Sequence, residues 1–180
     1  MEKHVPDIHR ELIGKCRAGD IRSQYRLYKL YSKAMYNVAV RMLADPMDAE
    51  DVLQEAFVAA FGGLHKFREE SSFGTWLKKI VVNRCINFLK AKNEMPDDLE
   101  NIGKDDFEES WENENFNDDL EFIHRAIKEL PAGARTVFTL FLLEGYGHHE
   151  IAKMLNISES TSKSQYQRAK RLLKEKLVGK

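Results

Sequence analysis

The sequence predicts an all-α protein with two small helical domains that are joined by an acidic flexible linker. Proline and glycine are scarce, with 4 and 10 residues in a chain of 180, and β-branched runs are sparse. Apolar residues recur at intervals of three and four along most of the chain, which is the helical period. The net charge of -1 conceals a segregation, because residues 94–121 hold 13 acids against one lysine while the remainder holds 16 acids and 27 bases. We therefore predict two basic domains, residues 1–93 and 120–180, around a linker of residues 94–119.

The first two expected helices have clear ends. A short helix is expected from Asp7 to Ala18, and Asp20 is placed to cap a longer one that reaches about Leu43. A break follows at residues 44–46, which include a proline. One stripe of the longer helix is expected to be buried, and it comprises Tyr25, Tyr28, Tyr31, Met35, Val38 and Met42.

The third expected helix, from about Asp48 to Phe61, has an apolar side and a polar side. The polar side carries Asp48, Asp51, Gln54 and Glu55. Acids near a helix N-terminus interact favourably with the helix dipole, which accounts for Asp48 and Asp51. The dipole accounts less well for Gln54 and Glu55, so a polar docking face is the second interpretation. The residues expected to be buried are Val52, Leu53, Ala56, Phe57, Ala60 and Phe61.

The fourth expected helix follows a loop after Gly62 and Gly63, is capped by Ser71 or Ser72, and continues to about Lys92. Its core stripe is Leu77, Val81 and Phe88. A neighbouring stripe holds Trp76, Ile80, Asn83 and Asn87, and positive charge comes from Lys78, Lys79, Arg84, Lys90 and Lys92. Rings, amides and cations together suit the unstacked bases of single-stranded nucleic acid. A solvated helix face explains the lysines equally well.

The acidic linker is low in apolar residues, although Phe107, Trp111 and Phe116 are unusual in a pure spacer and indicate a short docking segment. A helical period resumes with Leu120, Ile123, Ile127 and Leu130. Pro131 falls in the first turn of the next helix, where its missing N–H costs little. The core face expected for that helix is Val137, Phe138, Phe141 and Leu142.

Two helices around a tight turn are predicted from Gly145 to Leu177. Asn156 tolerates the left-handed backbone that the turn needs, and Ser158 is a good N-cap for the second helix. Inward-facing residues are Ile151, Ala152 and Leu155 on the first helix and Tyr166, Ala169 and Leu173 on the second. The other faces of the second helix carry Lys163, Ser164, Gln167, Arg168, Lys170 and Arg171. Short donors followed by cations suit a helix in the DNA major groove. An amphipathic basic helix on a bundle surface is the alternative, and the short helix with its asparagine turn favours helix-turn-helix.

Several classes of protein are excluded by features that the sequence lacks. No signal peptide or apolar span long enough for a membrane is evident, so we expect a cytoplasmic chain without direct membrane insertion. Cys16 and Cys85 are too isolated for a disulfide framework or a zinc site. His148, His149 and Glu150 do not form an HExxH motif, and adjacent histidines point to different sides of a helix. No phosphate-binding loop or activated nucleophile is found, so we expect no catalytic residue, no metal and no cofactor.

Two stretches resemble the extracytoplasmic-function sigma factors, the small group IV class of the sigma-70 family. Residues 48–90, which begin DAEDVLQEAF, closely resemble region 2 of that family, and YRLYKLYSKAMYNVAVRML matches the start of the region. Residues 129–173, which contain EIAKMLNISES, look like region 4. The two blocks stand in the family's order and are separated by the expected linker. The resemblance implies a factor that binds core RNA polymerase and directs it to promoter DNA.

The resemblance also implies roles for individual residues. The helix with Asp48, Asp51, Gln54 and Glu55 would dock on the clamp coiled coil of the polymerase, and region 4 would rest on the flap. The −10 element would be bound as a single strand with one flipped base, at Phe67, Ser71, Trp76, Ile80, Asn83 and Arg84. The −35 duplex would be contacted by His148, Lys163, Ser164, Gln167, Arg168, Lys170 and Arg171. An anti-sigma factor is a further partner that the resemblance implies.

Three departures from the family's pattern bear on these roles. Ser162 stands where the family usually has a buried valine, so the second helix of the motif is expected to pack less tightly or sit differently. Tyr166 and Gln167 are less usual and leave the −35 preference open. Gly74 follows Phe73 where a larger residue is common.

Two other functions compete with this interpretation. A stand-alone helix-turn-helix regulator would explain residues 145–177 but would leave residues 48–90 unused, and tight DNA binding by the chain alone would favour it. An enzyme is the second rival, for which a stoichiometric metal assay is the simplest test.

Overall fold

The computed structural model describes residues 9–93 and 120–178, and all regular structure in them is helical. The chain divides into two compact units, residues 1–88 and residues 89–180. The docking segment expected around Phe107, Trp111 and Phe116 lies outside the described residues.

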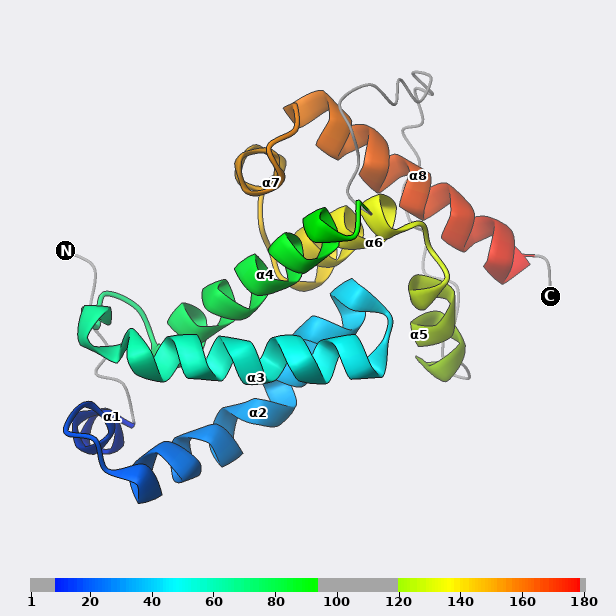
Figure 1. The fold of residues 1–180 in the computed structure, drawn as a ribbon. Helices are drawn as coiled ribbons and strands as arrows, with labels where there is room; N and C mark the ends of the chain where they lie inside the picture. The colour runs from blue at the N-terminus through cyan, green and yellow to red at the C-terminus, as the bar shows by residue number, and fades with distance from the viewer. Residues whose placement is uncertain (1–8, 94–119, 179–180) are drawn as a thin grey trace. The chain divides into compact units, whose positions relative to one another are not determined.

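The first unit opens with α1 (Arg10–Arg17), α2 (Ile21–Leu43) and α3 (Pro46–Gly62), which are coloured blue to cyan in Figure 1. Asp20 caps α2 as expected, since its carboxylate accepts a hydrogen bond of 3.1 Å from the Ser23 N–H. Ala44 takes a left-handed conformation with φ 63°, which separates α2 from α3. The cap of α3 is Asp45, whose carboxylate accepts from the N–H groups of Met47 and Asp48 at 2.8 and 3.0 Å. The helix thus starts two residues earlier than predicted.

The tyrosine stripe of α2 is only partly buried, contrary to the prediction of one buried face. Tyr25 is 60% exposed, whereas Leu27, outside the stripe, is fully buried. Tyr31 is half-buried between the rings of His9 and Phe73, with centroids 5.7 and 5.2 Å away. The tyrosine hydroxyl allows such a residue to sit at the boundary of a core with one end in water, so the stripe marks the edge of the core.

A short connection leads from α3 to α4 (Phe73–Ala91) through the 3₁₀ turn η1 (Leu64–Lys66). Ser72 is the cap of α4, because its hydroxyl oxygen accepts from the Thr75 N–H at 3.2 Å. The core stripe of α4 is confirmed at Leu77 and Val81, while Phe88 is half-buried.

The packing of α4 against α2 explains why position 74 is a glycine. A Cβ at Gly74 would lie 2.9 Å from Cε1 of Tyr31, closer than side chains normally approach. The glycine therefore allows the start of α4 to approach α2.

The second unit contains α5 (Leu120–Lys128), α6 (Ala132–Phe138), η2 (Thr139–Leu143), α7 (His148–Leu155) and α8 (Glu159–Val178). Its core draws on α5, α6 and α8 and comprises Ala126, Ile127, Leu130, Ala134, Phe138, Ala169 and Leu173. Arg135 is buried at 6% exposure, and its Nη1 donates to the carbonyl oxygens of Lys128 and Leu130 at 3.1 and 2.8 Å. A buried guanidinium thus satisfies backbone carbonyls at the end of α5.

The core face predicted after Pro131 is right at its start and wrong at its end. Val137 and Phe138 are buried, but Leu142 is 53% exposed and Leu140 is fully buried instead. The reason is that residues 139–143 form a π-helical turn, η2. A π turn holds more residues than an α turn, so the buried positions after it move out of the α-helical period.

The turn between α7 and α8 agrees with its prediction. Asn156 is left-handed, with φ 59° and ψ 48°, and the Ser158 hydroxyl oxygen accepts from the Thr161 N–H at 3.0 Å. Ile151, Ala152 and Leu155 are buried on α7 as expected. The two helices therefore form the predicted helix-turn-helix, drawn in orange and red in Figure 1.

Candidate polymerase and nucleic-acid interfaces

The outer face of α3 is polar in its middle and apolar at both ends. Asp51, Gln54 and Glu55 are exposed, as the docking interpretation requires. Met47 and Val58, which the sequence analysis did not single out, are 76% and 74% exposed on the same face. Positions 47, 51, 54 and 58 follow the helical period, so that period was the signal for the two apolar residues. Covering these two apolar side chains with a protein partner would remove their apolar area from water.

Asp48 is the one member of the predicted polymerase-binding set that is half-buried. Its N–H donates a hydrogen bond to the carboxylate of Asp45, which is the cap of α3. The negative charge of Asp48 still lies in the first turn of α3, where the helix dipole favours it.

Arg84 on α4 forms an ion pair with Glu55 on α3, with an N–O distance of 3.4 Å. The pair joins a residue predicted to bind −10 DNA with a residue predicted to bind polymerase. Both side chains are largely exposed, at 43% and 64%, so the pair contributes little to stability and is readily exchanged for other partners.

The loop before α4 is held by Arg17 at the end of α1. The Arg17 guanidinium donates to the carbonyl oxygens of Phe67 and of Leu64, and it forms a 3.1 Å ion pair with Glu69. Arg10 pairs with the same carboxylate at 3.2 Å. Glu69 has a left-handed φ of 60°, which is unusual for a non-glycine residue. Two arginines therefore fix a strained loop, and these contacts could not be predicted from the sequence because they join residues about 50 positions apart.

The predicted −10 residues divide into a buried member and a more exposed stripe. The Phe67 ring is only 3% exposed and lies against the rings of Phe73 and Trp76, with centroids 5.8 and 5.2 Å away. Phe67 is thus a core residue of the described chain as well as a predicted contact. Trp76 and Ile80 are half-buried along α4. The exposed members of the set are Ser71, Asn83 and Arg84.

The outer face of α8 presents the predicted −35 residues. Lys163, Gln167 and Arg171 are exposed at successive helical turns, and Ser164, Arg168 and Lys170 are half-buried beside them. Positions 163, 167 and 171 are four residues apart, so these three side chains lie in a row along one side of the helix. The alternative, an amphipathic basic helix on a bundle surface, is weakened because α8 is the second helix of a helix-turn-helix.

Two of the cations on α8 are paired with acids of the same helix. Nζ of Lys163 lies 2.8 Å from Oε1 of Glu159, and Nη1 of Arg171 lies 3.4 Å from Oε1 of Glu175. The Lys163 ammonium lowers the pKa of the Glu159 carboxyl by a hydrogen bond and by its charge. Exposed pairs at this spacing are weak, so phosphate oxygens can replace the carboxylates as partners.

The half-buried side chain of His148 contacts both η2 and α8. Its ring stacks on Phe141 with centroids 4.2 Å apart, and its Nδ1 is 2.9 Å from Oγ of Ser162 on α8. Ser162 is fully buried at the position where a valine was expected. The polar residue is therefore accommodated by a hydrogen bond, which sequence reasoning missed because the partner is on another helix.

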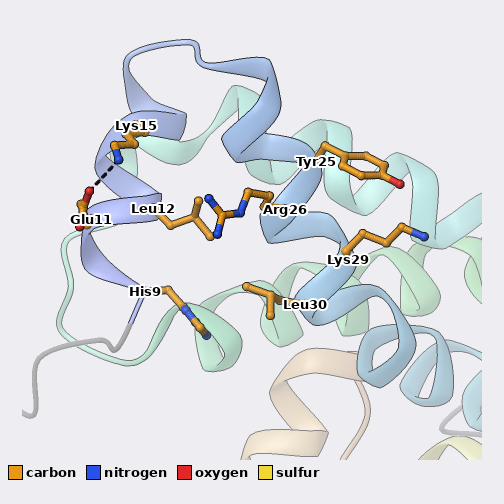
Figure 2. A pocket seen from close by; sticks show the side chains of 8 residues that line it. All are labelled: His9, Glu11, Leu12, Lys15, Tyr25, Arg26, Lys29 and Leu30. Carbon is orange, nitrogen blue, oxygen red and sulfur yellow. Dashed lines mark hydrogen bonds and ion pairs between the residues drawn. The ribbon is translucent and has the colours of Figure 1, made fainter.

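A cavity of about 560 Å³ opens between α1 and α2 (Figure 2). Lys15 lies on its α1 side, and Arg26 and Lys29 lie on its α2 side, with Leu12 and Leu30 between them. Lys15 is paired with Glu11 at 2.6 Å. None of the predicted contact residues lines this cavity, so it is separate from the interfaces described above.

Both cysteines are free thiols, and both side chains are buried. Burial raises the pKa of the Cys85 thiol to about 12 and also raises that of Cys16. Within residues 9–93 and 120–178, no three His, Cys, Asp or Glu side chains gather in a way that could hold a metal ion. In the same part of the chain, no helix has the length and apolar character needed to cross a membrane.

Comparisons with known proteins agree on one family. Residues 27–94 match the family described as Sigma-70 region 2, and residues 121–173 match the family described as Sigma-70, region 4. The RNA polymerase sigma-H factor of Pseudomonas aeruginosa is 32% identical, over 93% of this chain and 92% of that protein. The ECF RNA polymerase sigma-E factor of Escherichia coli K12 is 30% identical, over 92% of each.

Two solved structures share the fold. CnrH, solved in complex with the cytosolic domain of CnrY, aligns with a TM-score of 0.55 and 22% identity, over 96% of this chain and 99% of that chain. The sigma factor RpoE of Bartonella quintana, solved with the anti-sigma factor NepR, aligns with a TM-score of 0.56 and 22% identity, over 88% of this chain and 98% of that chain.

Proposed function

The chain belongs to the extracytoplasmic-function class of sigma-70 family RNA polymerase sigma factors, and from this premise we propose how its surfaces divide the work of initiation. The observation that carries the proposal is that each unit presents a distinct exposed face. In the first unit this is the polar face of α3 together with α4, and in the second it is the cationic row of α8. We assign polymerase and single-stranded DNA to the first unit and duplex DNA to the second.

Core polymerase docks on the outer face of α3, at the clamp coiled coil. Asp48, Asp51, Gln54 and Glu55 supply the polar contacts. The exposure of Met47 and Val58 supports the docking, because apolar residues at an interface are released from water on binding. The exposed Leu142 and Leu143 offer a corresponding apolar surface in the second unit for the flap.

The −10 element binds along α4 as a single strand. Trp76 and Ile80 provide apolar surface for a base, the exposed Asn83 amide provides edge contacts, and Arg84 provides charge for the phosphate backbone. Unstacking a base costs a few kcal/mol, and stacking of about 1–3 kcal/mol per base offsets it. Ser71 lies just before the cap of α4, where it can contact the single-stranded DNA at the start of that helix.

The −35 element binds to α8 as a duplex. Gln167 can read a base edge with its amide, while Lys163, Arg168, Lys170 and Arg171 hold phosphates. Ser164 lies on the same side of the helix, although its hydroxyl donates to the carbonyl oxygen of Ser160 at 2.9 Å. His148, which the resemblance places at the DNA backbone, lies next to this helix with its Nδ1 2.9 Å from Oγ of Ser162.

The chain performs no chemistry of its own in this proposal, because polymerase forms the phosphodiester bonds. It acts in the cytoplasm, where polymerase and the chromosome meet. An anti-sigma factor that covers the two faces is the regulatory partner in this proposal, and the structurally similar RpoE was solved in complex with the anti-sigma factor NepR.

The proposal is tested by transcription in vitro with purified core polymerase, with and without the chain, on fragments of the source genome. Transcripts with defined starts that depend on the chain are expected, and their upstream regions should share two elements. If no such transcripts appear and gel filtration shows no complex between the chain and core polymerase, the proposal is contradicted and the stand-alone regulator is favoured. Silence with a stable complex would contradict only the choice of DNA fragments, and further fragments would then be screened.

A further inference from the structure

Ser162 and His148 form a polar pair between the two helices of the helix-turn-helix. Ser162 is fully buried, and its Oγ lies 2.9 Å from Nδ1 of His148. The His148 ring is stacked on Phe141 of η2 with an interplanar angle of 14°, and it meets the Tyr166 ring edge-on at 5.7 Å. His148 is therefore fixed from three sides, by η2, by Tyr166 and by the hydroxyl of Ser162.

The pair lies next to the DNA-facing row of α8. Lys163 follows Ser162 directly, and Gln167 lies one turn further along the same side. Successive residues of an α-helix are about 100° apart around its axis, so fixing the direction of Ser162 also fixes the direction of Lys163. A rotation of α8 that displaced Lys163 and Gln167 would break the hydrogen bond to His148.

We propose that His148 and Ser162 are positioning residues, whose hydrogen bond sets the rotation of α8 against α7 and η2 and so orients Lys163 and Gln167 toward duplex DNA. The inference rests on the proposed role of α8 in binding duplex DNA. In this role His148 acts through Ser162, and the ring contributes by alignment of the helix instead of by its own contact with phosphate.

The electrostatics around the ring agree with a neutral partner for the hydroxyl. Burial lowers the pKa of His148, the nearby Lys163 ammonium lowers it further, and Glu159 acts in the opposite direction. A neutral imidazole offers one donor and one acceptor nitrogen, so it can pair with a serine hydroxyl in either tautomer.

Two substitutions of the same shape isolate the hydroxyl. Ser162→Thr and Ser162→Val give branched side chains of nearly the same shape, but only threonine keeps the hydroxyl that forms the hydrogen bond. We expect the threonine variant in complex with core polymerase to bind a −35 duplex fragment as the wild type does, and the valine variant to bind about tenfold more weakly. The fragment is taken from a promoter that the wild-type chain transcribes. If the larger side chains prevent folding, Ser162→Ala is used in place of Ser162→Val, and its affinity is compared with that of the wild type.

Coupling between the two residues is the decisive readout. His148→Phe keeps the ring stacked on Phe141 and removes its nitrogens, and it should weaken binding as much as Ser162→Val. The double variant should be no weaker than either single variant, since both partners then lack polar groups. His124→Phe is the matched control, because its side chain is exposed on α5, and it should leave the affinity unchanged.

Two results would overturn the inference. Equal affinity of the threonine and valine variants would show that the hydroxyl does not matter. The second result is a loss of affinity for the duplex in His148→Phe but not in Ser162→Val. If the salt dependence of that affinity also falls by about one phosphate contact, His148 contacts the DNA backbone directly. A wild-type chain that fails to bind any promoter with core polymerase would instead contradict the proposed function itself.

Discussion

At the scale of the residue, the atypical side chains have identifiable neighbours. Gly74 is small because the Tyr31 ring occupies the space where a Cβ would lie. Ser162 is polar because His148 meets it inside the fold. Arg135 is buried because two carbonyl oxygens at the end of α5 need donors. These three departures from a simple apolar pattern are thus each matched by a steric or hydrogen-bonding partner outside their own helix.

The steric role of Gly74 is tested by Gly74→Ala. Alanine favours a helix over glycine by about 1 kcal/mol, so propensity alone predicts stabilisation. We expect destabilisation by about 1 kcal/mol instead, because the Tyr31 ring is held by His9 and Phe73 and overpacking costs about 1–3 kcal/mol. Urea unfolding of the full chain measures the difference. Gly14→Ala is the control, since nothing lies within 4 Å of its Cβ, and it should stabilise the chain.

The lowered pKa of His148 predicts a dependence of stability on pH. The unfolded chain takes up a proton on this histidine as the pH falls through about 6.5, whereas the folded chain takes it up only at lower pH. Stability should therefore be complete above about pH 6.5 and fall below it. The charged groups that face the ring are Lys163 and Glu159, both on α8.

Urea unfolding at pH 7.5 and pH 5.5 measures this dependence. The loss between the two pH values should be smaller in His148→Phe than in the wild type. An equal loss in both chains would assign the dependence to other groups.

At the scale of the element, helix ends place the surfaces that matter. Asp45 begins α3 with two hydrogen bonds and so fixes where Asp51 and Gln54 emerge. Ser158 begins α8 and fixes its first turn next to Asn156. The π turn η2 shifts the helical period, which buries Leu140 and exposes Leu142.

The cap of α8 is tested by Ser158→Ala, which removes the acceptor for the Thr161 N–H. Loss of such a cap costs about 1 kcal/mol, so the free energy of unfolding of the second unit should fall by about that amount. Ser160→Ala is a control in the same turn, because it leaves the acceptor in place and removes only the 2.8 Å hydrogen bond between the Ser160 and Ser158 hydroxyls, so its cost should be smaller. An equal effect of both substitutions would mean that the cap is not what stabilises the turn.

The outer face of α3 is tested by replacing Asp51 and Gln54 together with alanine, and Val58 separately with aspartate. Both changes leave the buried side of the helix untouched, so we expect an unchanged circular dichroism spectrum and weaker binding to core polymerase. The charge at Val58 should cost more, tenfold or above, because an unpaired charge would be buried at the interface. Unchanged affinity of the double alanine variant would contradict the docking role of Asp51 and Gln54.

At the scale of the whole molecule, the two units present different binding chemistry. The first unit combines a polar and apolar face on α3 with rings and an amide along α4. The second unit presents a row of cations on a recognition helix. This division predicts that DNA melting and duplex binding can be impaired separately.

The separation is tested by Asn83→Ala. Loss of its amide should reduce opening of the −10 region several-fold, since one polar contact to a base edge is removed, while −35 duplex binding by the complex with polymerase is unchanged. Permanganate reactivity of the −10 thymines measures opening, and a duplex fragment measures the second property. Gln167→Ala should have the opposite pattern. Equal loss of both properties in Asn83→Ala would indicate a folding defect.

Much of this organisation could be predicted from the sequence because it depends on local rules. Caps, the left-handed Asn156 and the helical period are decided by residues within a few positions of one another, and they predicted the helices with errors of a few residues at their ends. The charge segregation predicted the linker, which lies outside the described residues. The order of the two motifs indicated the sigma factor family, and the comparisons confirmed it.

The tertiary structure decided what depends on distant partners. Arg17 holds a loop about 50 residues away, Ser162 pairs with a histidine on the preceding helix, and Phe67 is buried by rings from α4. The tyrosine stripe lies at the edge of the core, and the π turn changes which leucine is buried. These features follow from how helices pack against one another, because close packing and hydrogen-bond satisfaction are properties of neighbours in space. Spacing along the chain determines which face of a helix is apolar, but only packing determines how deeply each side chain on that face is buried.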